Sequence, residues 1–320
     1  MNNSLSSAAP AASQVPAWFH KLLAQPVESG MVSVDGTDVA YRAWGDRADP
    51  TIVLVHGGAA HAHWWDAHAP LLAQHHRVIA VDLSGHGDSG WRPVYNPEQW
   101  AREVVAVAEA GGGQERPVVV GHSMGGFVTV LTAARYGRQL AGAIVLDAPV
   151  TRPDPESNEG REGRMFRAPK IYPDVTTALE HFHLVPPQPC DNGWLVEHIG
   201  RHSLREVNDG WTWKFDPALF SMREGPLVPS DFADDLAHAA CRVAIINGAK
   251  SAIVDERARR DMSELLGVSP AGTAGVPFVE IPEAHHHLIL DQPLAVVSAI
   301  RAVLASWTPV GTPPAEVIAD

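Results

Sequence analysis

A serine lies in a glycine-rich turn whose spacing suits a nucleophile. The turn reads Gly121-His122-Ser123-Met124-Gly125 and joins the apolar run PVVVGH to the helix-compatible segment MGGFVTVLTAARY. A sharp turn from strand to helix leaves no room for side chains two positions either side of the serine, and its strain exposes the hydroxyl. The start of the helix would place the Met124 N–H beside a developing oxyanion. The alternative is an ordinary turn whose serine caps the helix, but the preceding buried strand favours a nucleophile.

Three consecutive histidines, His285, His286 and His287, follow the apolar run VPFVEI and precede the last helical segment. A serine that is not activated attacks poorly at neutral pH, so a histidine within hydrogen-bond reach must take its proton and later return it to the leaving group. A metal site shared with His61 and His63 is the alternative. Neighbouring histidines on one loop rarely all face one ion, and no regular spacing of His, Cys or carboxylate ligands supports such a site. We therefore expect a general base here and no metal.

The elements that must position these residues are short strands in alternation with helical segments. A hairpin signal around Asp35-Gly36 comes first. Runs rich in β-branched residues then follow, separated by longer helix-compatible segments. This alternation predicts an α/β fold with a mostly parallel central sheet between helices. The expected strands are 51–56, 77–82, 117–122, 141–147, 241–248 and 276–281.

The alternation stops at about residue 150 and returns at about 238. The stretch between shows no strand pattern and is rich in proline, glycine, histidine and aromatic residues. We interpret it as a mainly helical cap over the carboxyl ends of the strands, where open α/β sheets bind ligands. The expected organisation is an N-terminal tail over 1–30, a core over 31–149, the cap over 150–237, the second part of the core over 238–310, and a C-terminal tail over 311–320.

Four motifs in a fixed order resemble the α/β-hydrolase superfamily over residues 31 to 308, apart from the insertion. They are HGG at 56–58, DLSGHGDS at 82–89, GHSMGG at 121–126 and AHHHLILDQP at 284–293. The resemblance implies that the Gly58 N–H is the second oxyanion donor, opposite Met124. It also implies, counting back from Pro293, that His286 is the base, with His287 as the fallback. We expect His86 to be structural, because histidines that hydrogen-bond a loop are commoner than catalytic ones.

The carboxylate that orients the histidine has two candidate positions. In much of the superfamily it follows the seventh strand, but Ser251 and Ala252 stand there in this chain. Asp255 and Glu256 come late enough to begin a helix instead. The other position known in the superfamily is the end of the sixth strand, where Asp147 stands. We favour Asp147 as the acid and keep Asp255 as the fallback.

The expected chemistry is hydrolysis of a carboxylic ester or lactone through an acyl-enzyme on Ser123, without a cofactor, because serine, imidazole and backbone dipoles supply the whole mechanism. Serine at this position argues against epoxide hydrolase and haloalkane dehalogenase chemistry. C–C bond hydrolysis, thioester or amide cleavage, acyl transfer and perhydrolysis stay open, as does a receptor that only binds its ligand. An apolar pocket for a small substrate is expected from His61, Trp64, Trp211 and Trp213, although each tryptophan alone could simply pack the cap.

Composition excludes several other classes. With a net charge of −13, the protein should repel nucleic acids and anionic membranes. Two cysteines, Cys190 and Cys241, cannot build a disulfide framework. The N-terminus lacks the features of a secretory signal, and no apolar stretch is long enough to span a bilayer. We expect a cytoplasmic protein that acts on a small molecule, with no nucleic-acid or membrane partner; a homo-oligomer is compatible with these properties.

Overall fold

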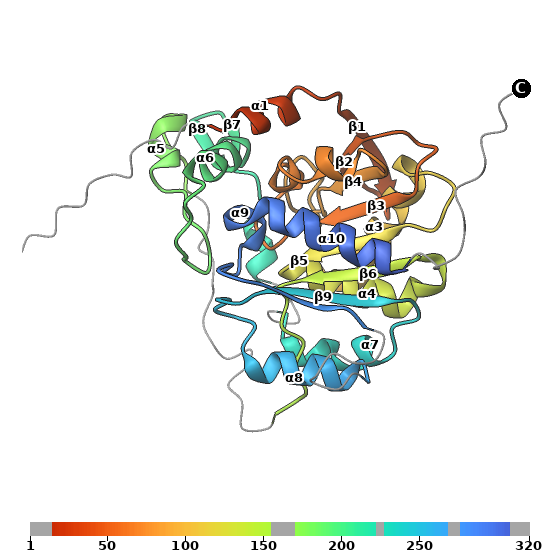
Figure 1. Ribbon diagram of the computed structural model, residues 1–320. Coiled ribbons are helices and arrows are strands. Elements are labelled where there is room, and N and C mark those ends of the chain that lie inside the picture. The colour runs from red at the N-terminus through yellow and green to blue at the C-terminus, as the bar shows by residue number, and fades with distance from the viewer. Residues whose placement is uncertain (1–14, 155–169, 222–226, 268–275, 308–320) are drawn as a thin grey trace, which may run out of the picture.

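A computed structural model describes residues 15–154, 170–221, 227–267 and 276–307 (Figure 1). Its centre is an eight-stranded sheet in the order β1-β2-β4-β3-β5-β6-β9-β10. The strand β2 pairs antiparallel with β1 and β4, and all the other pairs are parallel. This confirms the predicted α/β fold. The strands are β1 (Glu28–Val34), β2 (Thr37–Trp44), β3 (Thr51–Val55), β4 (Arg77–Val81), β5 (Val118–His122), β6 (Gly142–Leu146), β9 (Val243–Gly248) and β10 (Phe278–Ile281).

The first two strands form the predicted hairpin. Asp35 and Gly36 have φ angles of 48° and 78°, and such a pair of positive values defines the tight turns whose twist matches a hairpin. Every residue of the strands β3, β4, β5, β6 and β9 is buried, as expected for parallel strands covered on both faces.

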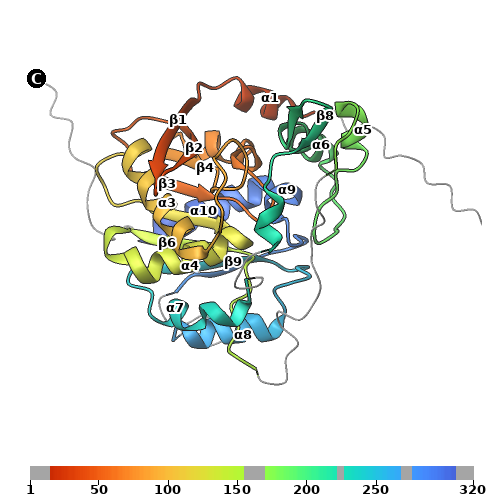
Figure 2. The same ribbon diagram turned by 180° about the vertical axis from the view of Figure 1, so that it is seen from behind.

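Helices cover both faces of the sheet (Figures 1 and 2). On one face, Ile52 and Leu54 share an apolar cluster with Ile300. On the other, Val53 and Val55 pack in a cluster with Trp100 and with Val128. Alternate residues of one strand therefore serve the two layers. The helices of the core are α1 (Ala17–Leu23), α2 (Ala69–Leu72), α3 (Pro97–Gly111), α4 (Met124–Tyr136), α8 (Glu256–Leu265), α9 (Leu288–Asp291) and α10 (Pro293–Trp307), with short 3₁₀ turns η1 (Ala62–Trp65) and η2 (Gly137–Gln139).

The predicted cap contains a small sheet as well as helices. Its elements are α5 (Val175–Leu179), α6 (Gly193–His202), β7 (Leu204–Val207), β8 (Gly210–Trp213), η3 (Pro217–Ser221), η4 (Pro229–Phe232) and α7 (Ala233–Ala237). The antiparallel hairpin of β7 and β8 lies in a stretch whose sequence shows no strand pattern, so the mainly helical cap also holds two strands. Each strand has only four residues, too short for a readable alternation, and backbone hydrogen bonds between Trp211 and Tyr172 extend the pairing.

Two predicted boundaries differ from the packing. The predicted tail includes α1, yet Phe19 is buried and its ring centroid lies 4.6 Å from that of Trp194 in the cap. The predicted cap includes α7, yet Leu236 belongs to an apolar cluster of the core together with Phe127 and Met262. Amphipathic helices this short carry too little pattern to show which layer they join. The predicted C-terminal tail, 311–320, lies outside the described residues.

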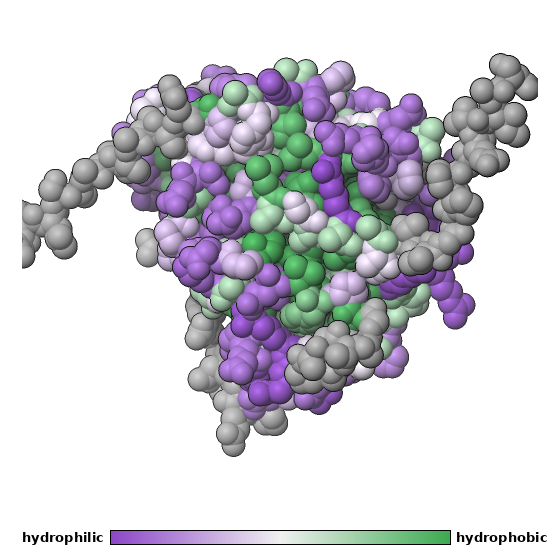
Figure 3. Space-filling model, in the orientation of Figure 1, coloured by the Kyte–Doolittle hydropathy of each residue, from purple (hydrophilic) through white to green (hydrophobic). Residues whose placement is uncertain are grey.

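The surface on the α10 side carries apolar residues in the middle of the face (Figure 3). Leu294, near the start of α10, is 49% exposed. Within the described part of the chain, no helix combines the length and the apolar character needed to cross a bilayer.

Candidate active site

The nucleophile elbow is built as its glycines predict. Ser123 lies between β5 and α4 with φ 56° and ψ −121°, a conformation that is strained for a residue with a side chain. A Cβ placed on Gly121 would lie 2.0 Å from the carbonyl oxygen of Gly125, and one on Gly125 would lie 2.5 Å from that of His56. Backbone atoms therefore exclude any side chain at either glycine, and the turn holds Ser123 partly exposed at the carboxyl end of the sheet.

Ser123, His286 and Asp147 form a continuous hydrogen-bonded chain. Ser123 Oγ lies 3.0 Å from His286 Nε2, and His286 Nδ1 lies 2.8 Å from Asp147 Oδ2. Because an ionised carboxylate only accepts, Nδ1 carries the hydrogen and Nε2 is left to accept from the serine hydroxyl. His286 and Asp147 are 2% and 0% exposed, so the chain is shielded from water on the side away from the serine.

Two further donors hold the Asp147 carboxylate. The Gly248 N–H donates to Oδ1 over 2.9 Å, and the Ser251 hydroxyl donates to Oδ2 over 2.6 Å. Ser251 thus stands at the position where the superfamily pattern led us to expect the acid, and its hydroxyl bonds to Asp147, the predicted acid. The fallback residue, Asp255, instead caps α8, because its Oδ1 accepts from the Ala258 N–H over 2.8 Å. The geometry therefore joins Asp147 to the histidine and gives Asp255 a structural contact.

The loop expected to supply the second oxyanion donor lies against the elbow. A Cβ on Gly57 would lie 3.3 Å from the Ser123 Cβ, and one on Gly58 would lie 3.8 Å from Met124 Sδ. Met124 is the first residue of α4, so its N–H has no partner within the helix. The glycine loop therefore lies against Ser123 and Met124, as the predicted pair of oxyanion donors, Gly58 and Met124, requires.

Backbone strain concentrates around these groups. Five described residues other than glycine have a positive φ angle, and one of them, Asp35, lies in the first hairpin. The other four are Ala59, Ser123, Asp147 and Glu283, with φ angles of 56°, 56°, 46° and 63°. The four lie in the glycine loop, at the elbow, at the acid and in the turn before the histidines, respectively. Such conformations cost on the order of 1–3 kcal/mol each and persist only where surrounding packing enforces them.

Several buried histidines surround the base. The His122 ring lies 4.9 Å from that of His286, and its Nε2 lies 2.9 Å from the His286 carbonyl oxygen, to which it donates. Burial lowers the pKa of His287 to about 3 and holds that of His122 well below its usual range. Both imidazoles are therefore neutral at pH 7. His287, the fallback base, forms no hydrogen bond through either ring nitrogen, whereas His286 contacts the serine.

The expected pocket residues separate into two groups. The Trp64 ring lies 5.6 Å from that of His287, beside the base. His61 is buried, and its Nε2 lies 2.8 Å from Ser203 Oγ, which ties the core to the end of α6. Trp211 and Trp213, by contrast, pack on an apolar cluster inside the cap with Tyr172. The prediction that these two tryptophans line the pocket is not supported, because the hairpin uses them to hold the cap together.

Sequence reasoning missed several residues that support the site. Gln188 Oε1 accepts from the His287 N–H over 2.7 Å, and Asn192 Nδ2 donates to the Leu290 carbonyl oxygen over 2.8 Å, so the cap holds the loop of the base. Only His122 carried a local signal, since it precedes the nucleophile directly. His86 has the structural place expected of it: it is buried, with Nδ1 3.3 Å from the Ser84 carbonyl oxygen.

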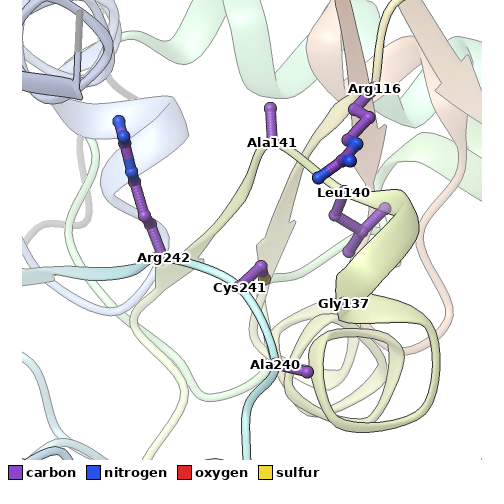
Figure 4. A pocket seen from close by; sticks show the side chains of 7 residues that line it. All are labelled: Arg116, Gly137, Leu140, Ala141, Ala240, Cys241 and Arg242. Carbon is purple, nitrogen blue, oxygen red and sulfur yellow. The ribbon is translucent and has the colours of Figure 1, made fainter. Parts of the chain in front are cut away.

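A pocket of 420 Å³ lies at the end of the sheet opposite to Ser123. Figure 4 shows the side chains that line it. Its lining residues precede β5, β6 and β9, whereas Ser123 follows the carboxyl end of β5. The length of a strand therefore separates this pocket from the triad. The lining residues are Arg116, Gly137, Leu140, Ala141, Ala240, Cys241 and Arg242.

Two groups of three histidines in the described parts of the chain have ring nitrogens within 4.8 Å of one another. One is His122, His286 and His287 at the base. The other is His63, His198 and His202, between η1 and α6. Only the second is independent of the serine.

The fold and this triad define a serine hydrolase, and comparison with known proteins agrees. The model of the alpha/beta hydrolase family matches residues 52–300, so the chain belongs to that family.

Several similar proteins are named as esterases or hydrolases. Esterase Rv0045c of Mycobacterium tuberculosis is 27% identical over 82% of this chain and 84% of its own length. A protein named as a putative non-heme haloperoxidase of Mycobacterium phage D29 is 27% identical over 86% of this chain and 94% of its own. The structure of E-2-(acetamidomethylene)succinate hydrolase matches with a TM-score of 0.71 at 19% identity, over 88% of this chain and 100% of that one, which shows the fold alone.

Proposed function

We propose that the protein hydrolyses a carboxylic ester or lactone through an acyl-enzyme on Ser123. The observation that carries this proposal is the chain of contacts from Asp147 through His286 to Ser123 Oγ. His286 Nε2 takes the hydroxyl proton as Oγ attacks the carbonyl carbon, and Asp147 stabilises the imidazolium that forms.

The tetrahedral intermediate places its negative charge on the former carbonyl oxygen. The N–H groups of Met124 and Gly58 donate to that oxygen, and the helix dipole of α4 adds to their effect. His286 then passes its proton to the leaving alkoxide, which departs as the alcohol. A water molecule gives a proton to His286 and attacks the acyl carbon, and Ser123 recovers its proton when the carboxylic acid leaves.

A small, largely apolar substrate is the class we propose. Trp64 is 7% exposed and packs beside the base, and Met124 lies partly buried against an apolar cluster that also meets Phe215 and Leu227. An apolar acyl or alcohol group would gain free energy by leaving water for such surroundings.

The test is a substrate series. Para-nitrophenyl esters of increasing acyl length, aryl esters and lactones are assayed with wild-type protein, with Ser123→Ala as the blank. We expect turnover of at least one of these classes with wild-type protein and loss to the blank with the variant. Turnover that Ser123→Ala retains would show that another group performs the chemistry.

A ligand-binding role without turnover is the alternative from another class. A fluorophosphonate probe separates the two, because it forms a covalent adduct only with an activated serine. We expect labelling of the wild-type protein at Ser123 and none of Ser123→Ala. Failure of the folded wild-type protein to react would favour the receptor. One similar protein is named as a haloperoxidase. The substrate series should therefore also test peracid formation from hydrogen peroxide and a carboxylic acid.

A further inference from the structure

Three histidines meet between the cap and the core, away from the triad. His198 and His202 are four residues apart on α6 and so point from the same face of that helix. His63 comes from η1, which follows the glycine loop of the core. The His63 and His202 rings stack with centroids 4.0 Å apart, and the His198 and His202 centroids are 4.4 Å apart.

The ring nitrogens are arranged as ligands. Each histidine offers one nitrogen, and these atoms all lie within 4.8 Å of one another. His202 Nδ1 donates to the His198 carbonyl oxygen over 2.8 Å, so Nε2 is the nitrogen that keeps a lone pair. A ligating histidine is commonly fixed in this way, by a backbone carbonyl on its other nitrogen.

A carboxylate completes the group. Asp66 Oδ2 lies 2.8 Å from His63 Nδ1 and 2.8 Å from His198 Nε2, and its side chain is 3% exposed. Two histidines four apart on a helix, a third imidazole and a carboxylate form a donor set that suits zinc and its neighbours. The imidazoles are partly exposed, so an ion can reach them from solvent.

We propose that His63, His198 and His202, with Asp66, bind one divalent transition-metal ion such as Zn²⁺ or Co²⁺ and thereby clamp the cap helix α6 onto the core. In a tetrahedral site with bonds of about 2.1 Å, ligand atoms are about 3.4 Å apart, so the rings must close by roughly 1 Å. Side-chain rotation supplies such a change. Binding replaces the hydrogen bonds of His63 and His198 to Asp66 by metal bonds, and the ring hydrogen of each neutral imidazole then stands on its other nitrogen.

Arg42 is the group that opposes binding. Its Nη1 lies 2.5 Å from His63 Nδ1 and forms an ion pair with Asp66 Oδ1. A cation must therefore displace the guanidinium from His63, and the two positive charges then repel each other. The Arg42 side chain is 19% exposed and can turn toward solvent. The variant Arg42→Gln should bind the ion more tightly than wild type.

The experiment uses full-length protein without a histidine tag, freed of metal with a chelator and titrated with Co²⁺. Wild-type protein should bind one Co²⁺ with the intense visible bands of tetrahedral coordination, and Zn²⁺ should displace it and raise the melting temperature. Loss of one imidazole ligand, in His202→Gln or His198→Gln, should weaken binding by at least about tenfold. His183→Gln, which removes an exposed histidine elsewhere in the cap, should bind like wild type.

A further variant, His287→Gln, distinguishes the proposed site from the histidines around His286. If His287→Gln abolishes Co²⁺ binding while His202→Gln preserves it, the ion binds beside the triad and the proposal is wrong. Absence of a Co²⁺ spectrum in wild-type protein also overturns it. Circular dichroism of each metal-free variant shows that it is folded, and none of these measurements depends on hydrolytic activity.

Discussion

At the scale of single residues, Asp147 and Asp255 differ in their hydrogen-bond partners. Asp147 is fully buried and bonded to the base, whereas Asp255 caps a helix. A carboxylate can do either task, and the distinction depends only on its partners. The same substitution, aspartate to asparagine, can therefore be made at each position and its effects compared.

Replacing Asp147 by Asn should reduce kcat by roughly 10³- to 10⁴-fold, because an amide no longer holds His286 in the tautomer that accepts from serine. The change Asp255→Asn should leave kcat near wild type and the free energy of unfolding within about 0.5 kcal/mol, since asparagine caps helices about as well. Ester turnover and urea unfolding of both variants test this. The opposite order of effects would assign the acid to Asp255.

At the scale of elements, the loop between β9 and α8 holds the carboxylate of Asp147, the proposed acid. Besides its bond to Asp147, Ser251 Oγ accepts from the Val254 N–H over 3.0 Å, so one hydroxyl closes the loop and holds the carboxylate. The loop before α9 plays the same part for the base, with Gln188 of the cap as its partner.

The substitution Ser251→Ala should lower kcat roughly tenfold, equivalent to about 1.4 kcal/mol, because Asp147 loses one of its donors. KM should change little, because the hydroxyl bonds to the acid rather than to substrate. Ser251→Thr, which keeps a hydroxyl, should recover most of the activity, and Ser298→Ala on the exposed side of α10 controls for loss of a serine. Equal activity of the alanine and threonine variants would contradict a positioning role.

The contact between cap and base loop gives a second prediction at this scale. Gln188→Ala removes the acceptor for the His287 N–H and should lower kcat/KM several-fold, because the loop that carries His286 becomes less fixed. The neighbouring exposed residue Asp191 supplies the control, Asp191→Ala. Steady-state kinetics on the ester that is turned over fastest measure kcat/KM for both variants. An unchanged kcat/KM in Gln188→Ala would contradict a role of Gln188 in holding the loop of His286.

At the scale of the whole molecule, buried histidines make folding depend on pH. Burial lowers the pKa of His56 to about 4 and that of His68 to about 3, and it holds those of His61, His86 and His122 well below their usual range. Below pH 6.5 the unfolded chain binds protons that the folded protein excludes, so stability falls as pH drops from about 6.5 toward 4. Asp82, whose pKa burial raises to about 6, acts in the opposite direction but is outnumbered.

His68 isolates one share of this dependence. It is fully buried with both ring nitrogens unpartnered, so it should contribute about 1.4 kcal/mol of lost stability per pH unit below pH 6.5. The variant His68→Gln should therefore show a shallower fall of unfolding free energy between pH 6.5 and 5, whatever its stability at pH 7. Urea titrations across this range measure the slope. The control His183→Gln, at an exposed histidine, should have the slope of wild type. An unchanged slope in His68→Gln would show that His68 does not contribute to the pH dependence of stability.

The sequence by itself determined what depends on neighbours along the chain. The glycines around Ser123, the short apolar runs and the Asp35-Gly36 turn are local steric and burial patterns, so the α/β fold and the elbow could be predicted from them. The α/β-hydrolase family and the loop of His286 followed from the resemblance of four motifs in their order along the chain. Such patterns cannot distinguish residues of the same type at different positions, such as Asp147 from Asp255 or His286 from His287. Only the tertiary structure decided that His286 contacts both Ser123 and Asp147, that Ser251 bonds to the acid, and that Trp211 and Trp213 pack inside the cap. It also brought His63 of the core against His198 and His202 of the cap. These contacts join segments far apart in the sequence, and their geometry exists only once the sheet, the loops and the cap have packed together.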